Sequence, residues 1–84
     1  MYEDLYWNGK RLAFTRHFKE ELAMLNKFEE FALYILERGI HERISKRQNK
    51  YNVLCRHKKK AICLIYAVHE ESIIMIHIKP IRRK

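Results

Sequence analysis

Apolar and polar residues alternate on both sides of Asn8-Gly9, near the start of the chain. Asn-Gly is the preferred pair for a two-residue type I′ turn, because both of its residues must adopt a positive φ. The pattern therefore predicts a β-hairpin whose short strands lie near residues 5–7 and 11–14.

Apolar residues recur at helical spacing in the two segments that follow. The first stripe comes after Thr15, a good N-cap, and consists of Phe18, Leu22 and Leu25. The second stripe follows Asn26, which is expected to end the first helix and cap the next, and consists of Phe28, Phe31, Ala32, Ile35 and Leu36. Gly39 then stands where a helix normally ends. These spacings predict two consecutive amphipathic helices.

The C-terminal half of the chain has the pattern of strands. Residues 40–50, "IHERISKRQNK", are expected to form a polar, basic connector. Three strands follow near residues 50–57, 60–68 and 72–79, and Pro80 ends the last because proline has no N–H for a ladder. The expected fold class is α+β: an N-terminal β-hairpin, then two helices packed on one face of a three-stranded antiparallel meander.

Turn lengths give an expected register for this meander. A three-residue loop over residues 58–60 would place Cys55 opposite Cys63. A two-residue loop after the second strand would place Tyr66 opposite Met75. The helices would then cover a face made of Tyr51, Val53, Cys55, Cys63, Ile65, Ala67, Ile74, Ile76 and Ile78. The opposite, mixed face would carry Asn52, Leu54, Arg56, Ile62, Leu64, Tyr66, Val68, Ile73, Met75, His77 and Lys79.

The 84 residues carry a formal net charge of +8, which is unevenly divided along the chain. Residues 1–42 hold six Lys or Arg against eight Asp or Glu, whereas residues 43–84 hold twelve against two. This division predicts one basic and one acidic surface, and a polyanion is the natural partner of the basic one. Solubility alone is the alternative explanation. A chain of this length is expected to form a single domain, residues 1–84, with at most a shallow active site.

Composition excludes several classes of protein. The hydrophobic content of 48% is too high for a disordered chain. Glu3 and Asp4 interrupt any signal peptide, and the longest apolar run, residues 61–68, is too short to span a bilayer. A cytoplasmic protein without membrane contact is therefore expected, and Cys55 and Cys63 are expected to be free thiols.

The spacing of ligating residues predicts no metal and no cofactor. The five histidines fall in none of the spacings typical of zinc sites; they are His17, His41, His57, His69 and His77. Two glycines cannot build a phosphate-binding loop. His17 is expected to be a surface residue in the first turn of the first helix, and the glutamates after it are expected to be solvated.

Arg56, Tyr66 and His77 supply the chemistry of the mixed face. Arginine offers a fixed fork of donors to phosphate, tyrosine can stack on a base, and histidine can carry a proton at neutral pH. Beside a phosphodiester these groups suffice for metal-independent RNA cleavage by the 2′-OH, with Arg56 and His77 as the catalytic residues. Lys79 would contact the nucleic acid on the same face. The alternative is that the N-terminal hairpin or a second copy of the chain covers this face.

The helices, the connector and the segment "KYNVLCRHKKKAICLIYAVHEESIIMIHIKPIRRK" together resemble the RelE/ParE-like superfamily of small toxin domains, over residues 15–84. The segments "FTRH", "ERGI" and "Y-x-V" are also similar to small uncharacterised families attached to that superfamily. The resemblance implies that Lys46, Arg47 and Lys50 in the connector bind RNA, and that Arg56 and the C-terminal His77, Arg82 and Arg83 correspond to residues that serve its cleavage. The RelE-like hypothesis uses the following basic residues to position the RNA backbone: Lys46, Arg47, Lys50, Lys58, Lys59, Arg82 and Arg83. The tyrosine usual near the C-terminus of RelE-like messenger-RNA interferases is missing here.

The sequence leaves two classes of function open. The first is a RelE-like nucleic-acid-binding domain and metal-independent mRNA interferase toxin, which would cut ribosome-bound mRNA and pair with an acidic antitoxin protein. The second is a small non-enzymatic module that binds DNA, RNA or another protein, and that could form a homodimer through the mixed face or an edge strand. Discrete cleavage products favour the first class, and salt-sensitive binding without product favours the second.

Overall fold

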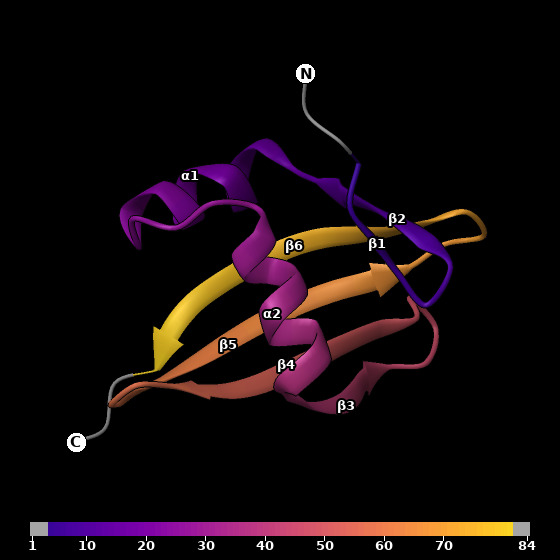
Figure 1. The fold of residues 1–84 in the computed structure, drawn as a ribbon. Coiled ribbons are helices and arrows are strands. Elements are labelled where there is room, and N and C mark those ends of the chain that lie inside the picture. The colour runs from indigo at the N-terminus through magenta and orange to yellow at the C-terminus, as the bar shows by residue number, and fades with distance from the viewer. Residues whose placement is uncertain (1–3, 82–84) are drawn as a thin grey trace.

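The structure is a computed structural model that describes residues 4–81. Its elements in chain order are β1 (Tyr6–Trp7), β2 (Lys10–Phe14), α1 (Arg16–Met24), α2 (Glu30–Arg38), β3 (Ile40–Ser45), β4 (Lys50–His57), β5 (Lys60–Val68) and β6 (Ser72–Ile81). The strands form one curled sheet; α2 crosses one of its faces, and α1 lies beside β6 (Figure 1). No helix in this part of the chain is long and apolar enough to cross a membrane.

The predicted three-stranded meander is wrong, because the meander is only half of a six-stranded mixed sheet with the order β1-β2-β6-β5-β4-β3. The connector predicted over residues 40–50 contains β3, which pairs antiparallel with β4 and places Ile40 opposite Leu54. An edge strand tolerates charged residues such as Glu42 and Arg43, since only one of its sides is paired. Because of this polar composition, the sequence pattern did not predict β3.

The predicted N-terminal hairpin is confirmed, but it belongs to the same sheet. Asn8 and Gly9 form its turn, with φ angles of 53° and 77°. β2 then runs parallel to β6, with Leu12 opposite Ile73. A parallel pair needs a long crossover, and the helices with the remaining strands supply it. Because β2 ends at Phe14, it leaves the second half of β6 without a neighbouring strand on that side.

α1 occupies the place beside the second half of β6. Thr15 is its N-cap, as predicted: the hydroxyl oxygen accepts the N–H of Phe18 at 3.1 Å and donates to the carbonyl of Met75 at 3.0 Å. Further along α1, Glu21 is 7% exposed, and its Oε1 accepts the N–H of Ile78 at 3.1 Å. The carboxylate of Glu21 thus accepts the backbone N–H of Ile78, which a neighbouring strand would otherwise accept.

α2 begins at Glu30 without a side-chain cap, so the cap predicted at Asn26 is wrong. Asn26 instead has a positive φ of 56° in the turn after α1. The predicted end at Gly39 is confirmed, because the chain passes there directly into β3. A Cβ at Gly39 would overlap the Val53 side chain on β4, so the close approach of the chain to the sheet requires glycine here.

The predicted register of β4 and β5 is wrong by one residue. Their turn has two residues rather than three, with Lys58 at a φ of 57°, so Cys55 lies opposite Ile62 instead of Cys63. A shift of one residue exchanges the two faces of a strand. Five residues predicted for the mixed face are therefore buried in the core: Ile62, Leu64 and Tyr66 on β5, with Ile73 and Met75 on β6.

The predicted pairing of Tyr66 with Met75 is confirmed. A bulge follows at once, and it sets His77 opposite Ile65. Because of this bulge, His77 stays on the face without helices, where the sequence placed it. We call this the outer face; its central side chains are Asn52, Leu54, Arg56, Cys63, Ile65, His77 and Lys79.

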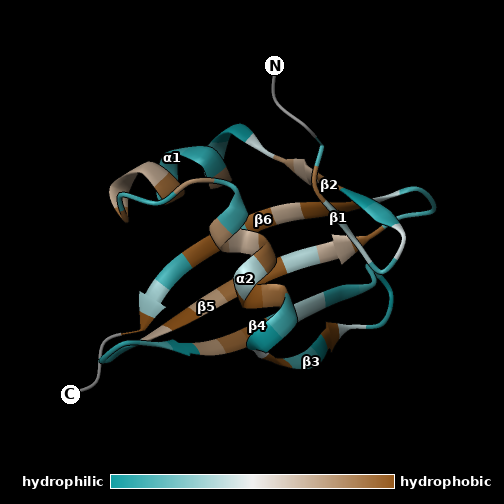
Figure 2. Ribbon diagram, in the orientation of Figure 1, coloured by the Kyte–Doolittle hydropathy of each residue, from teal (hydrophilic) through white to brown (hydrophobic). Residues whose placement is uncertain are grey.

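The core lies between the helices and the sheet. In Figure 2 the central strands β5 and β6 carry much of the hydrophobic colour, whereas the turns at their ends are hydrophilic. The helices bury Phe18, Leu22, Ala32, Ile35 and Leu36 against these strands. The hairpin closes one end of the same layer, because Trp7 stacks on His41 with 5.1 Å between ring centroids and meets Tyr66 edge-on at 6.0 Å. The hairpin therefore does not cover the outer face.

Candidate functional site

Arg56 and His77, the predicted catalytic pair, share the outer face but do not meet. Arg56 lies opposite Ala61 on β5, whereas His77 lies opposite Ile65, four residues further along the same strand. With strands about 4.8 Å apart and a rise of about 3.3 Å per residue, the two Cα atoms are about 16 Å apart. The predicted catalytic pair is therefore not assembled in this structure.

The predicted nucleic-acid-binding lysines and arginines fall into two groups at opposite ends of β4. Lys46 and Arg47 lie in the turn before this strand, and Lys50 is its first residue. Lys58 and Lys59 form the turn after it. An eight-residue strand separates the groups by about 23 Å. These five residues therefore form two clusters rather than one surface.

The remaining predicted residues have different positions. Tyr66 is 3% exposed beneath the helices, so the prediction that it stacks on a base is wrong; the register shift put it in the core. Lys79 is exposed on the outer face, with its Nζ 3.7 Å from Glu21 Oε2. Arg82 and Arg83 lie outside the described residues.

A cleft of about 510 Å³ opens beside the turn between β4 and β5. Its apolar lining consists of Leu25, Phe31 and Ile62, and its polar lining consists of Lys27, His57, Lys58, Lys59 and Lys60. Four lysines around an apolar surface suit an anion that also has an apolar or aromatic part. The sequence predicted Lys58 and Lys59 at an interface, but the other lining residues come from distant segments that only the fold brings together.

One side of α2 and the loop before it carries stacked aromatic rings with a cation at each end. The rings of Phe31 and Tyr34 have centroids 5.8 Å apart and planes 12° apart. Lys27 Nζ lies 5.0 Å from the Phe31 centroid, and the Arg38 guanidinium lies 4.2 Å from the Tyr34 centroid. These four residues, spaced three or four apart, form what we call the aromatic–cationic stripe. Their spacing was the sequence signal that could have revealed it.

His57 joins this stripe to the cleft. Its ring meets Phe31 and Tyr34 edge-on, at centroid distances of 5.0 and 5.4 Å. Burial of the ring, together with the charges of Lys27 and Lys58, lowers the pKa of His57 below its ordinary value. The ring is therefore neutral at pH 7, and an anion bound in the cleft would favour its protonated form.

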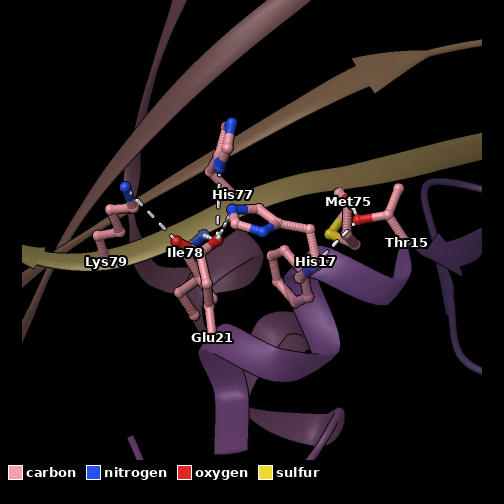
Figure 3. A network of polar contacts seen from close by, with 8 residues as sticks. Thr15, His17, Glu21, Met75, His77, Ile78 and Lys79 are labelled. Carbon is pink, nitrogen blue, oxygen red and sulfur yellow. Dashed lines mark hydrogen bonds and ion pairs between the residues drawn. The ribbon is translucent and has the colours of Figure 1, made fainter. Parts of the chain in front are cut away.

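A second polar cluster surrounds Glu21 at the border between α1 and β6 (Figure 3). Glu21 Oε1 lies 3.5 Å from His17 Nε2 and 3.4 Å from His77 Nδ1. The two imidazole rings meet edge-on, with centroids 4.9 Å apart. Two imidazoles and a carboxylate can hold a transition metal, so the sequence-based expectation of no metal-ligating group overlooked this set. The signal was the spacing of His17 and Glu21, four residues apart on one helix.

The outer face has an apolar centre and no helix over it. Ile40 is 76% exposed, and Leu54 and Ile81 are also exposed on this side of the sheet. Cys63 lies between them, and burial raises the pKa of its thiol. A raised pKa keeps the thiol protonated at pH 7, so Cys63 is a poor nucleophile. A homodimer through this face stays a prediction.

Comparison with known proteins reveals no relative: no family model, no curated protein and no solved structure matches the chain. The resemblance to RelE/ParE-like domains therefore stays a prediction, which rests on the short segments that carry it. The structure contains two candidate sites: the cleft with its aromatic–cationic stripe, and the cluster around Glu21.

Proposed function

We propose that the chain is a single-stranded nucleic-acid-binding domain whose contact surface is the cleft and the aromatic–cationic stripe. The supporting observation is that Lys58, Lys59 and Lys60 line one cleft with Phe31, whose ring stacks on Tyr34. Proteins bind single strands by combining cations that follow the phosphates with aromatic faces on which bases stack. Both parts are present in this cleft.

Charge and shape favour a flexible strand at this surface. Within residues 4–81, Lys58, Lys59 and Lys60 are exposed and form no ion pair. Glu30 and Glu37 are exposed on α2, but their helical positions lie beside the stripe rather than in it. Only an unstacked base can reach a ring that lies inside a cleft, which favours single strands over a duplex.

RNA is the proposed strand, and its support over DNA is the resemblance to RelE-like messenger-RNA interferases. Cleavage by Arg56 and His77 is not part of the proposal, because about 16 Å separates their Cα atoms. An acidic antitoxin segment would compete with RNA for the same lysines. Such a partner is compatible with the proposed surface and would inhibit binding.

The test measures the binding of a labelled single-stranded RNA by fluorescence anisotropy. Phe31→Leu removes the ring but keeps an apolar side chain, and it should weaken binding about tenfold, since stacking on one aromatic residue contributes about 1–3 kcal/mol. Phe28→Leu is the matched control, because Phe28 is 83% exposed and lies outside the stripe. Equal affinities of the two variants would contradict the proposed surface.

Salt dependence and product analysis complete this test. If four lysines neutralise phosphates of a single strand, log K should fall with log salt at a slope of about −3. A duplex of the same sequence should bind at least about tenfold more weakly. The RNA should remain intact on a denaturing gel in EDTA. Discrete cuts would show an endoribonuclease instead of a binding module.

A further inference from the structure

We propose that His17, Glu21 and His77 bind a divalent transition-metal ion at the border between α1 and β6, with Zn²⁺ as the best match to the donor set. Imidazole nitrogen and carboxylate oxygen are common ligands of this ion. None of the site's three residues lines the cleft that is proposed to bind nucleic acid. It therefore adds a property beyond the proposed function.

The carboxylate oxygen of Glu21 lies from each imidazole nitrogen at close to the spacing that a tetrahedral ion requires. Bonds of about 2.0–2.1 Å from Zn²⁺ hold neighbouring donor atoms about 3.3 Å apart. Glu21 Oε1 lies 3.5 Å from His17 Nε2 and 3.4 Å from His77 Nδ1, and all three atoms lie within 4.8 Å of one another. Two of the three donor pairs are therefore already close to the separation that bound zinc imposes.

The backbone positions these side chains. His17 and Glu21 are four residues apart on α1 and therefore share a helical face. Glu21 Oε1 also accepts the N–H of Ile78 at 3.1 Å, and Ile78 is the neighbour of His77 on β6. The hydrogen bond from Thr15 to the carbonyl of Met75 fixes the start of α1 on the same strand. The helix and the strand thus hold the three donors together.

His77 Nδ1 is a buried nitrogen without a hydrogen-bond partner. It lies 3.4 Å from Glu21 Oε1, which is too long for a hydrogen bond of good geometry. A buried polar atom without a partner destabilises the fold. A metal ion bound through the lone pair of this nitrogen would satisfy it.

Lys79 is the group that opposes a bound cation. Its Nζ lies 3.7 Å from Glu21 Oε2, but its side chain is 65% exposed and can turn into water. Both imidazoles are also partly exposed, so water can reach the ion as a fourth ligand. Three protein ligands with one open position are typical of catalytic zinc sites, whereas structural sites are closed.

The test uses untagged, metal-free protein, titrated with Zn²⁺ by isothermal calorimetry and with Co²⁺ by visible absorption. One ion per chain is expected, with the visible bands of tetrahedral Co²⁺ that Zn²⁺ then displaces. His77→Ala should lose these bands and bind Zn²⁺ at least about tenfold more weakly. His69→Ala is the matched control, since His69 is an exposed histidine beside the turn between β5 and β6.

A second variant keeps the test informative if His77→Ala fails to fold, which circular dichroism will show. Lys79→Met removes the opposing charge and should bind Zn²⁺ more tightly than the parent protein. A parent protein without saturable binding, or binding that neither His77→Ala nor Lys79→Met changes, would overturn the assignment. RNA binding is measured in EDTA, so a failure of the metal site leaves the nucleic-acid proposal standing.

Discussion

Tyr66 donates its hydroxyl hydrogen to His41 Nδ1 at 2.8 Å, and His41 Nε2 lies 2.8 Å from the carbonyl oxygen of Leu36. Since a carbonyl oxygen only accepts, His41 carries its proton on Nε2 and accepts through Nδ1. Burial, and to a smaller extent Tyr51, raises the pKa of Tyr66 to about 12. At the scale of single residues, Tyr66 therefore belongs to a buried hydrogen-bond network, although its chemistry alone suited base stacking.

Tyr66→Phe tests this position. The variant leaves His41 Nδ1 without its donor, and we expect a loss of about 1–3 kcal/mol in the free energy of unfolding, measured by urea denaturation. The affinity for single-stranded RNA should not change, because the ring lies under the helices. Unchanged stability together with weaker RNA binding would restore the original prediction for Tyr66.

His57 gives the protein a defined dependence on pH. Its folded-state pKa lies below the ordinary value of 6.5, because burial and the charges of Lys27 and Lys58 disfavour the protonated ring. The unfolded chain therefore binds this proton more readily, and the stability should fall as the pH drops below about 6.5 and through the folded-state pKa. Urea denaturation at several pH values should show a smaller acid loss for His57→Gln than for the parent; equal losses would contradict this cause.

At the scale of elements, local patterns predicted the hairpin and the two helices, but not how the strands pair. Asn8-Gly9 and Thr15 are local signals, so the sequence was sufficient to identify them. The parallel pairing of β2 with β6 joins residues about sixty positions apart and has no local signal. The register of β4 depended on whether the turn at Lys58 has two or three residues, which three consecutive lysines do not reveal.

Gly39→Ala tests the junction between α2 and β3. The added Cβ would overlap Val53, and overpacking of this kind costs about 1–3 kcal/mol in the free energy of unfolding. Gly9→Ala is the control, because nothing lies within 4 Å of that position and only its φ of 77° is unfavourable for alanine. Thermal and urea denaturation should show the larger loss for Gly39→Ala. An equal or smaller loss would mean that the chain does not approach β4 as described.

At the scale of the whole molecule, the fold separates basic residues that are grouped in the second half of the sequence. Twelve basic residues in the second half of the sequence predicted one basic surface. Among the residues that the structure describes, β4 separates Lys46, Arg47 and Lys50 at its start from Lys58 and Lys59 after its end. Lys58 and Lys59 could be proposed as binding residues from the sequence alone, because a run of lysines needs no fold to be recognised. Phe31 and His57 could not, since only the packing of α2 against β4 brings them together.

The measurement that tests the central claim most directly compares two charge reversals of equal size. Lys58→Glu with Lys59→Glu alters the cleft, whereas Lys46→Glu with Arg47→Glu alters the opposite end of β4. Each pair changes the net charge by the same amount, so a general electrostatic effect would weaken RNA binding equally. The proposed surface predicts that the cleft pair weakens binding of single-stranded RNA by at least about tenfold more than the other pair. Equal losses, or a greater loss from Lys46 and Arg47, would contradict the claim that this cleft binds the strand.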